Sequence, residues 1–117
     1  MRNFREMVIW NQGIELAVKI YSITKKFPHE ERFGLTSQLT KAAVSIPSNI
    51  AEGCSRKSEK DFARFLEHSL GSAYEVETDL VIAEKIGYVS REVATNYFNE
   101  LQSEQRQIHS LINKLRF

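Results

Sequence analysis

The chain has 117 residues, a formal net charge of +1 and a single cysteine. This length predicts one domain over residues 1–117, large enough to bury about two-thirds of its unfolded surface. The near-neutral charge excludes a strong overall field of either sign, and the lone cysteine excludes an internal disulfide framework.

Residues 1–10 mix charged and apolar side chains, which is not the pattern of a signal peptide. No apolar run approaches the ~20 residues that a membrane span needs. The sequence therefore predicts a cytoplasmic protein with no membrane partner.

The first predicted helix covers residues 9–26 and ends at Phe27-Pro28, because the residue before a proline avoids helical geometry. Apolar residues recur along it at helical spacing. The expected inner stripe is Trp10, Ile14, Ala17, Tyr21 and Thr24, widened by Leu16, Ile20 and Ile23.

The second predicted helix covers residues 35–53 and contains a proline. Its stripe is formed by Leu35, Leu39, Ala42, Ile46, Ile50 and Gly53. Because the stripe continues across Pro47, we expect one kinked helix in which the Ala43 carbonyl loses its backbone donor. Ser45, Ser48, Asn49 or water are candidates to satisfy that carbonyl. Gly53 suits a left-handed position after the helix.

The third predicted helix opens at Ser58 and ends at Gly87. Ser58 and Asp61 have the spacing of an N-terminal cap. The heptad seam comprises Phe62, Leu66, Ser69, Ala73, Val76, Leu80 and Ala83. Gly71-Ser72 lies mid-helix, where glycine is unfavourable, and a close approach of another helix would explain it.

The fourth predicted helix opens at Ser90 and continues the same spacing to the end of the chain. Gln105 is the one polar member of its seam, and such a residue can fix register or oligomeric state. The seam is Ala94, Phe98, Leu101, Gln105, Ile108, Ile112 and Leu115.

The four segments predict an all-α fold, an antiparallel up-down-up-down four-helix bundle with a proline-kinked second helix. The last two helices are expected to have nearly 30 residues each, ~42 Å, against ~27 Å for the first two. The longer pair would then overhang the shorter one and leave Phe65, Tyr97 and Phe117 partly bare. Such apolar surface predicts self-association.

The segment Ser45-Ile46-Pro47-Ser48-Asn49-Ile50-Ala51-Glu52-Gly53 resembles the 23S rRNA intervening-sequence protein family, also called four helix bundle proteins. The resemblance extends over about residues 4–117, with further matches at Gly34-Leu35, Arg56, Ser58, Phe62, Gly71-Ser72 and Gly87-Tyr88. It implies that Ser45, Pro47, Asn49, Glu52 and Gly53 form a structural motif. A shaped packing surface with no further role is the alternative for that segment.

The same resemblance implies a bacterial protein that assembles with itself into a ring-shaped homopentamer. Family members are encoded inside inserts in ribosomal RNA genes. The sequence is also distantly similar to the accessory protein of diversity-generating retroelements, a basic pentamer that works with a reverse transcriptase and nucleic acid. RNA or DNA is therefore an implied partner.

Motifs for catalysis are not found in the sequence. None of His29, His68 and His109 follows a glutamate at the spacing of di-iron bundle ligands, and no second histidine completes a zinc-protease motif. Cys54 follows a helix end, which opposes a thiolate, although Arg56 and Lys57 would favour one. We expect no enzyme activity, cofactor, metal or small-molecule substrate.

Four basic residues lie close together in the sequence: Arg56, Lys57, Lys60 and Arg64, here called the basic cluster. The cluster is either a phosphate-binding surface or a solvated helix face with internal salt bridges. The first interpretation predicts a non-enzymatic, nucleic-acid-associated homo-oligomer. The alternative is a protein-interaction scaffold that does not bind nucleic acid.

Overall fold

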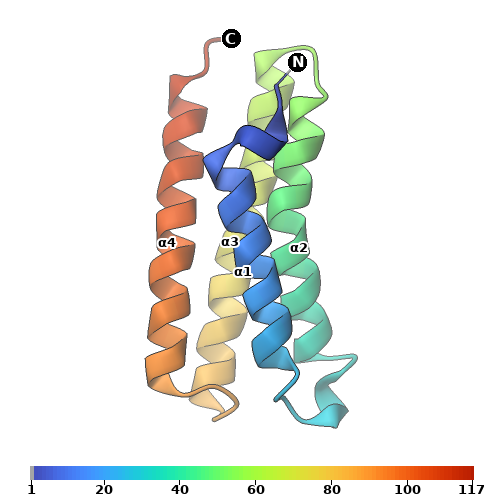
Figure 1. Ribbon diagram of the computed structural model, residues 1–117, viewed down its shortest axis with the longest axis vertical. Coiled ribbons are helices and arrows are strands. Elements are labelled where there is room, and N and C mark those ends of the chain that lie inside the picture. Colours follow the sequence, from blue (N-terminus) through green and yellow to red (C-terminus); the bar gives the residue numbers. More distant parts are fainter. Residues whose placement is uncertain (1) are drawn as a thin grey trace.

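The structure, a computed structural model, describes residues 2–117 and is all-α. The helices are α1 (Val8–Thr24), α2 (Leu35–Cys54), α3 (Glu59–Lys85) and α4 (Arg91–Lys114), with 3-10 turns η1 (Phe4–Glu6) and η2 (His29–Glu31). Successive helices run side by side in opposite directions (Figure 1). The predicted up-down-up-down four-helix bundle is confirmed, and Pro47 lies inside α2 as one continuous helix.

The predicted starts of the last two helices are confirmed by their caps. Ser58 Oγ accepts a hydrogen bond from the Asp61 amide at 3.1 Å, and Ser90 Oγ accepts one from the Val93 amide at 3.2 Å. Gly87 follows α3 with a φ of 89°, a conformation that glycine adopts without strain. These caps satisfy amide groups that have no partner within their helices.

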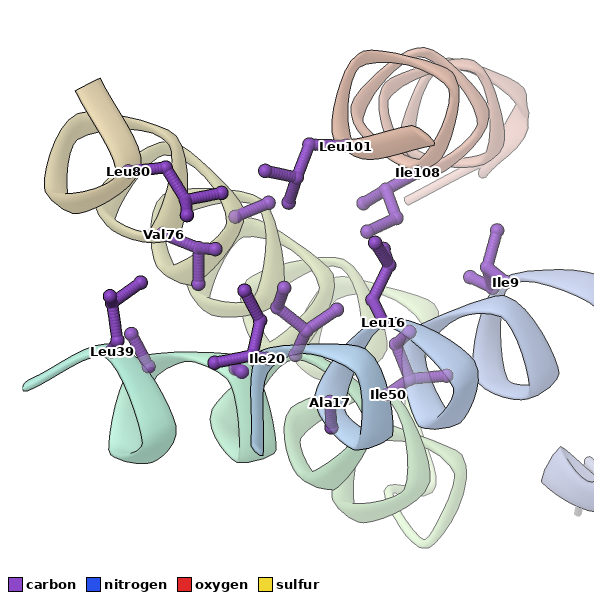
Figure 2. Close-up of a cluster of buried hydrophobic side chains, with 14 of the residues drawn as sticks. Ile9, Leu16, Ala17, Ile20, Leu39, Ile50, Val76, Leu80, Leu101 and Ile108 are labelled. Atoms are coloured by element: carbon purple, nitrogen blue, oxygen red, sulfur yellow. The ribbon is translucent and has the colours of Figure 1, made fainter. Parts of the chain in front are cut away.

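The interior is built from all four helices. Every residue of the predicted α3 seam is buried. Figure 2 shows Ile20 of α1, Leu39 of α2, Leu80 of α3 and Leu101 of α4 converging on the same interior space. Within residues 2–117, none of the helices has the length and apolar character that crossing a lipid bilayer requires.

The predicted inner stripe of α1 is wrong in part. Ile14 and Tyr21 are 38% and 50% exposed, so they lie on the outer side of the helix. The buried residues of this helix are Ile9, Gly13, Leu16, Ala17, Ile20 and Thr24. Gly13 lies in the middle of the buried face, but glycine is not scored as an apolar residue. Without Gly13, the apolar residues of this helix predict a face rotated toward Ile14 and Tyr21.

Two glycines have roles other than those predicted. Gly53 lies within α2 and has no positive φ; a Cβ added there would sit 2.9 Å from Phe65 Cβ, so it permits close packing of α2 on α3. Gly71 is exposed, and a Cβ there would meet nothing within 4 Å. The expected close helix approach at Gly71 is therefore wrong.

The predicted overhang is smaller than expected. The helices have 17, 20, 27 and 24 residues, because α4 ends at Lys114 rather than continuing to the last residue. Phe117 is exposed as predicted, and Tyr97 is half-buried, with its hydroxyl donating to the Lys19 carbonyl. Phe65 is buried, contrary to expectation, because α2 packs closely against it at Gly53.

Candidate nucleic-acid interface and the proline segment

The four residues of the basic cluster are all exposed and lie in the α2–α3 turn and the first turns of α3. Both chain termini lie at this same end of the bundle (Figure 1). The structure thus places the four predicted residues together on one end of the molecule.

Phe65 organises two members of the basic cluster. The guanidinium carbons of Arg56 and Arg64 lie 4.6 Å and 4.7 Å from the centre of its ring. A cation over an aromatic face is attracted by the ring quadrupole. The Phe65 ring therefore positions two guanidinium groups that arrive from different elements.

The chain termini bring two further basic residues to this end, and the sequence did not point to them. Arg2 lies 4.0 Å from the centre of the Phe62 ring and pairs with Glu59 at 3.5 Å. The Arg116 amide donates to the other oxygen of Glu59 at 2.8 Å. An even number of antiparallel helices returns both termini to the α2–α3 end, and this rule could have identified Arg2 and Arg116 in advance.

Two acidic residues reduce the positive charge of this end. Glu59 interacts with both terminal segments, and Asp61 Oδ1 lies 3.9 Å from Arg64 Nε. The Asp61–Arg64 pair is exposed and the Arg2–Glu59 pair is more than a third exposed, so each is weak and screened by salt. The basic cluster therefore carries a net positive charge that is smaller than its four cations suggest.

The proline segment forms a hydrogen-bonded joint between α2 and α3. Asn49 donates to both the carbonyl and the hydroxyl of Ser45, at 2.9 Å and 2.8 Å. The Ser45 hydroxyl lies 2.8 Å from that of Ser72, and the buried Ser69 hydroxyl donates to the Ile46 carbonyl at 2.8 Å. The motif residues thus tie the helix around its proline to α3.

The three side chains predicted to bond to the Ala43 carbonyl either form other hydrogen bonds or are exposed. Asn49 and Ser45 bond to each other, and Ser48 is exposed. None of the three predicted side chains donates to the Ala43 carbonyl. Glu52, another motif residue, is also exposed.

Glu104 of α4 is a buried polar residue that the sequence analysis missed. Its relative exposure is 0%, and burial raises the pKa of its carboxyl to about 8. It lies three residues after Leu101 and four before Ile108, which places it beside the seam. The predicted polar seam residue, Gln105, is also buried and donates to Glu77 at 2.8 Å.

The structure places Cys54 and the three histidines considered for catalysis on different elements. Cys54 is buried with its Sγ 3.5 Å from Met7 Sδ, and burial raises the pKa of its thiol. His29, His68 and His109 are exposed on separate elements. Across residues 2–117, no group of three or more histidine, cysteine, aspartate or glutamate side chains is arranged to hold a metal ion.

The chain matches one protein-family model and is similar to a solved structure. The family model described as "23S rRNA-intervening sequence protein" matches residues 5–110. Among solved structures, the chain is similar to a protein of unknown function from the S23 ribosomal protein family of Bacteroides thetaiotaomicron. That match has a TM-score of 0.81 and 26% identity, and it covers 90% of this chain and 98% of the other. A search among curated proteins returned no match.

Proposed function

Because the chain belongs to the 23S rRNA-intervening sequence protein family, we propose that it is a non-enzymatic homopentamer that binds nucleic acid through its basic end. The solved relative is itself described as a protein of unknown function. The proposal therefore rests on the chemistry of the basic end, and the predicted cytoplasmic location is part of it.

The observation that carries this proposal is the convergence of guanidinium groups at the end formed by the α2–α3 turn. Arg56 and Arg64 are positioned by the Phe65 ring, and Arg2 is positioned by Phe62. Guanidinium groups suit phosphate oxygens because their donors form a rigid fork. Contacts of this kind bind the nucleic-acid backbone without reading its sequence.

Self-association is supported by apolar side chains on the outside of the bundle. Val18 and Tyr21 of α1 are 64% and 50% exposed. On α3, Tyr74, Ile82 and Ile86 are also exposed. Exposed apolar surface of this kind marks interaction sites. Repetition of a weakly cationic end around a ring raises the overall affinity by avidity. The pentameric state is the one that the family resemblance implies.

The test combines sedimentation with nucleic-acid binding. We expect one species near five times the 13.5 kDa of a single chain. Binding of a mixed-sequence single-stranded RNA and of a duplex DNA, measured at low and physiological salt, should weaken steeply as salt rises. A monomer at micromolar concentration contradicts the assembly, and affinity that does not change with salt contradicts the phosphate contacts.

The variant for this test changes Arg56, Lys57, Lys60 and Arg64 together to glutamine. Its matched control changes four exposed basic residues at the opposite end of the bundle to glutamine: Lys25, Lys26, Lys85 and Arg91. Both variants lose the same charge. Only the first should abolish binding, and both should keep the oligomer. Binding that survives in the first variant rejects the basic end as the site.

The alternative is a protein-interaction scaffold without nucleic-acid affinity. The observation in its favour is the presence of Glu59 and Asp61 among the basic residues, together with the net charge of only +1. This alternative predicts the same sedimentation but no binding of either nucleic acid at low salt.

A further inference from the structure

The carboxyl group of Glu104 lies in the interior of the bundle, where no group of residues 2–117 donates a hydrogen bond to it. Its relative exposure is 0%, and neither of its oxygens accepts a hydrogen bond within the described residues. An ionised carboxylate in such a place loses its hydration without compensation, so the neutral form is favoured. Burial is the cause that raises the pKa of this carboxyl to about 8.

Glu104 lies where three helices meet. A Cβ added to Gly13 of α1 would sit 3.2 Å from Glu104 Oε2 and 3.3 Å from the Cβ and Cδ of Pro47 in α2. The absence of a Cβ at Gly13 therefore lets the carboxyl of α4 and the proline ring of α2 both approach α1 closely. The carboxyl is held next to the one residue of α2 that cannot donate a backbone hydrogen bond.

The Ala43 carbonyl, four residues before Pro47, can accept a hydrogen bond from the proton of a neutral carboxyl. Without an N–H at Pro47, the helical donor of the Ala43 carbonyl is missing. Ala43 is fully buried, and the hydroxyl and amide side chains around the proline bond to Ser45 and Ile46 instead. A neutral carboxyl carries one O–H donor, whereas a carboxylate carries none.

We propose that Glu104 keeps its proton in the folded protein and donates it to the carbonyl of Ala43, which latches α4 to α2. When the proton is lost, the latch is lost as well, and the carboxylate requires water. The seam between α1 and α4 then opens, because it is the route by which water can reach the group.

A cleft on this seam provides that route. It has a volume of about 310 Å³, and its lining includes Gln12 and Ser103, the residues that precede Gly13 and Glu104 in the chain. Its other polar lining residues include Lys19 and Glu100, which pair with each other across the seam. The cleft is partly open to solvent, so water would reach an ionised Glu104 if the two helices parted there.

No charged residue on the neighbouring helical turns that the structure describes forms an ion pair with Glu104, so none stabilises its ionised form. Glu77 accepts from Gln105, Lys19 pairs with Glu100, and neither bonds to Glu104. Asp79 is buried, one of its oxygens is unpartnered within the described residues, and burial raises the pKa of its carboxyl. The titratable residues on these turns are Glu15 and Lys19 of α1, Lys41 and Glu52 of α2, Glu77 and Asp79 of α3, and Glu100, Arg106 and His109 of α4.

The first test compares the unfolding equilibrium of wild type and Glu104→Gln in urea at pH 6 and pH 9. The folded carboxyl binds its proton more tightly than the unfolded one, whose reference pKa is 4.5. Its contribution to stability is therefore fully present below pH 4.5 and is lost as the pH rises through about 8. The wild-type unfolding constant should rise by roughly tenfold to a hundredfold more than that of Glu104→Gln.

The matched control is Glu92→Gln, an exposed carboxylate in the first turn of α4. It should keep the wild-type dependence on pH. If Glu104→Gln also keeps that dependence, the proposal is rejected. A titration of the side-chain carboxyl carbons of wild type by NMR needs no variant to fold: one glutamate should titrate well above the others, and a normal titration of Glu104 rejects the proposal.

The second test identifies the acceptor. Pro47→Ala restores a backbone N–H for the Ala43 carbonyl, so it removes the need for the Glu104 donor. Glu104→Leu should then raise the unfolding constant less in the Pro47→Ala background than in wild type, by roughly threefold to tenfold, the range of one hydrogen bond. An equal effect in both backgrounds shows that the Ala43 carbonyl is not the acceptor and overturns the latch.

Discussion

Gly13 of α1 and Pro47 of α2 pack directly against each other, so that even a single added carbon at Gly13 would lie 3.3 Å from the proline ring. The contact explains why a glycine occupies the middle of a helix, where it normally weakens the structure. Gly71 provides the comparison within the same chain, because a Cβ at that position meets nothing within 4 Å.

The first prediction uses this contrast between the two glycines. Gly13→Leu should destabilise the protein by about 1–3 kcal/mol, because the added side chain must displace the proline ring and the Glu104 carboxyl. Gly71→Ala should stabilise it by about 0.5–1 kcal/mol through helix propensity. Urea unfolding at one protein concentration measures both. A Gly13→Leu variant as stable as wild type would show that this contact is not tightly packed.

Sequence patterns predicted the fold where local chemistry and periodicity agree. Ser58 and Ser90 begin their helices as predicted, and the whole α3 seam is buried, because caps and heptad spacing act within one helix. The rotation of α1 was missed because its face is set by a contact with Pro47 of another helix. The burial of Glu104 was not predicted either. Its spacing from Leu101 and Ile108 places it on the inner face of α4, but a glutamate is normally expected on the surface.

The candidate interface was predicted only for the residues that are close in sequence. The basic cluster lies together because its members share one turn and the start of one helix. Arg2 and Arg116 join it through the return of the termini, and Phe65 positions two guanidinium groups through ring contacts. Such contacts depend on the packing of side chains from different elements, which spacing along the chain does not encode.

The second prediction concerns the proline. Pro47→Ala should leave the helical circular dichroism unchanged, because α2 is continuous across position 47 and is tied to α3 by the Ser69 and Ser72 hydroxyls. The effect should appear in the bundle-end geometry and in assembly, measured by sedimentation. A large loss of helical signal would show that the proline is required for the helix itself.

The third prediction concerns the pH dependence of the turn before α2. Glu31 accepts from the Leu35 amide at 3.0 Å and from the Tyr88 hydroxyl at 2.9 Å, and these bonds lower the pKa of its carboxyl. A lowered pKa in the folded state gives stability that is present above the unfolded value of 4.5 and is lost as the pH falls through the folded value.

Tyr88→Phe removes one of these two bonds. It should lower stability at pH 7 and make the loss of stability below pH 4.5 less steep than in wild type. Urea unfolding between pH 3 and pH 7, about the range of carboxylate titration, measures the slope. An equal loss of stability at every pH would show that the Tyr88 hydroxyl does not act through the Glu31 carboxyl.

The last prediction tests the charge of the basic end without removing any of its cations. Asp61 Oδ1 lies 3.9 Å from Arg64 Nε, while the Asp61 backbone amide donates to the Ser58 hydroxyl that caps α3. Asp61→Asn therefore removes one negative charge and leaves the cap intact. Affinity for a single-stranded RNA at low salt should rise by roughly 1.5-fold to fivefold, which corresponds to the ~0.2–1 kcal/mol of an exposed ion pair. Glu92→Gln makes the same change in charge in the first turn of α4, at the far end of the molecule, and should leave the affinity unchanged. Equal gains in both variants would mean that RNA responds to net charge alone, and the basic end would then have no special role in binding.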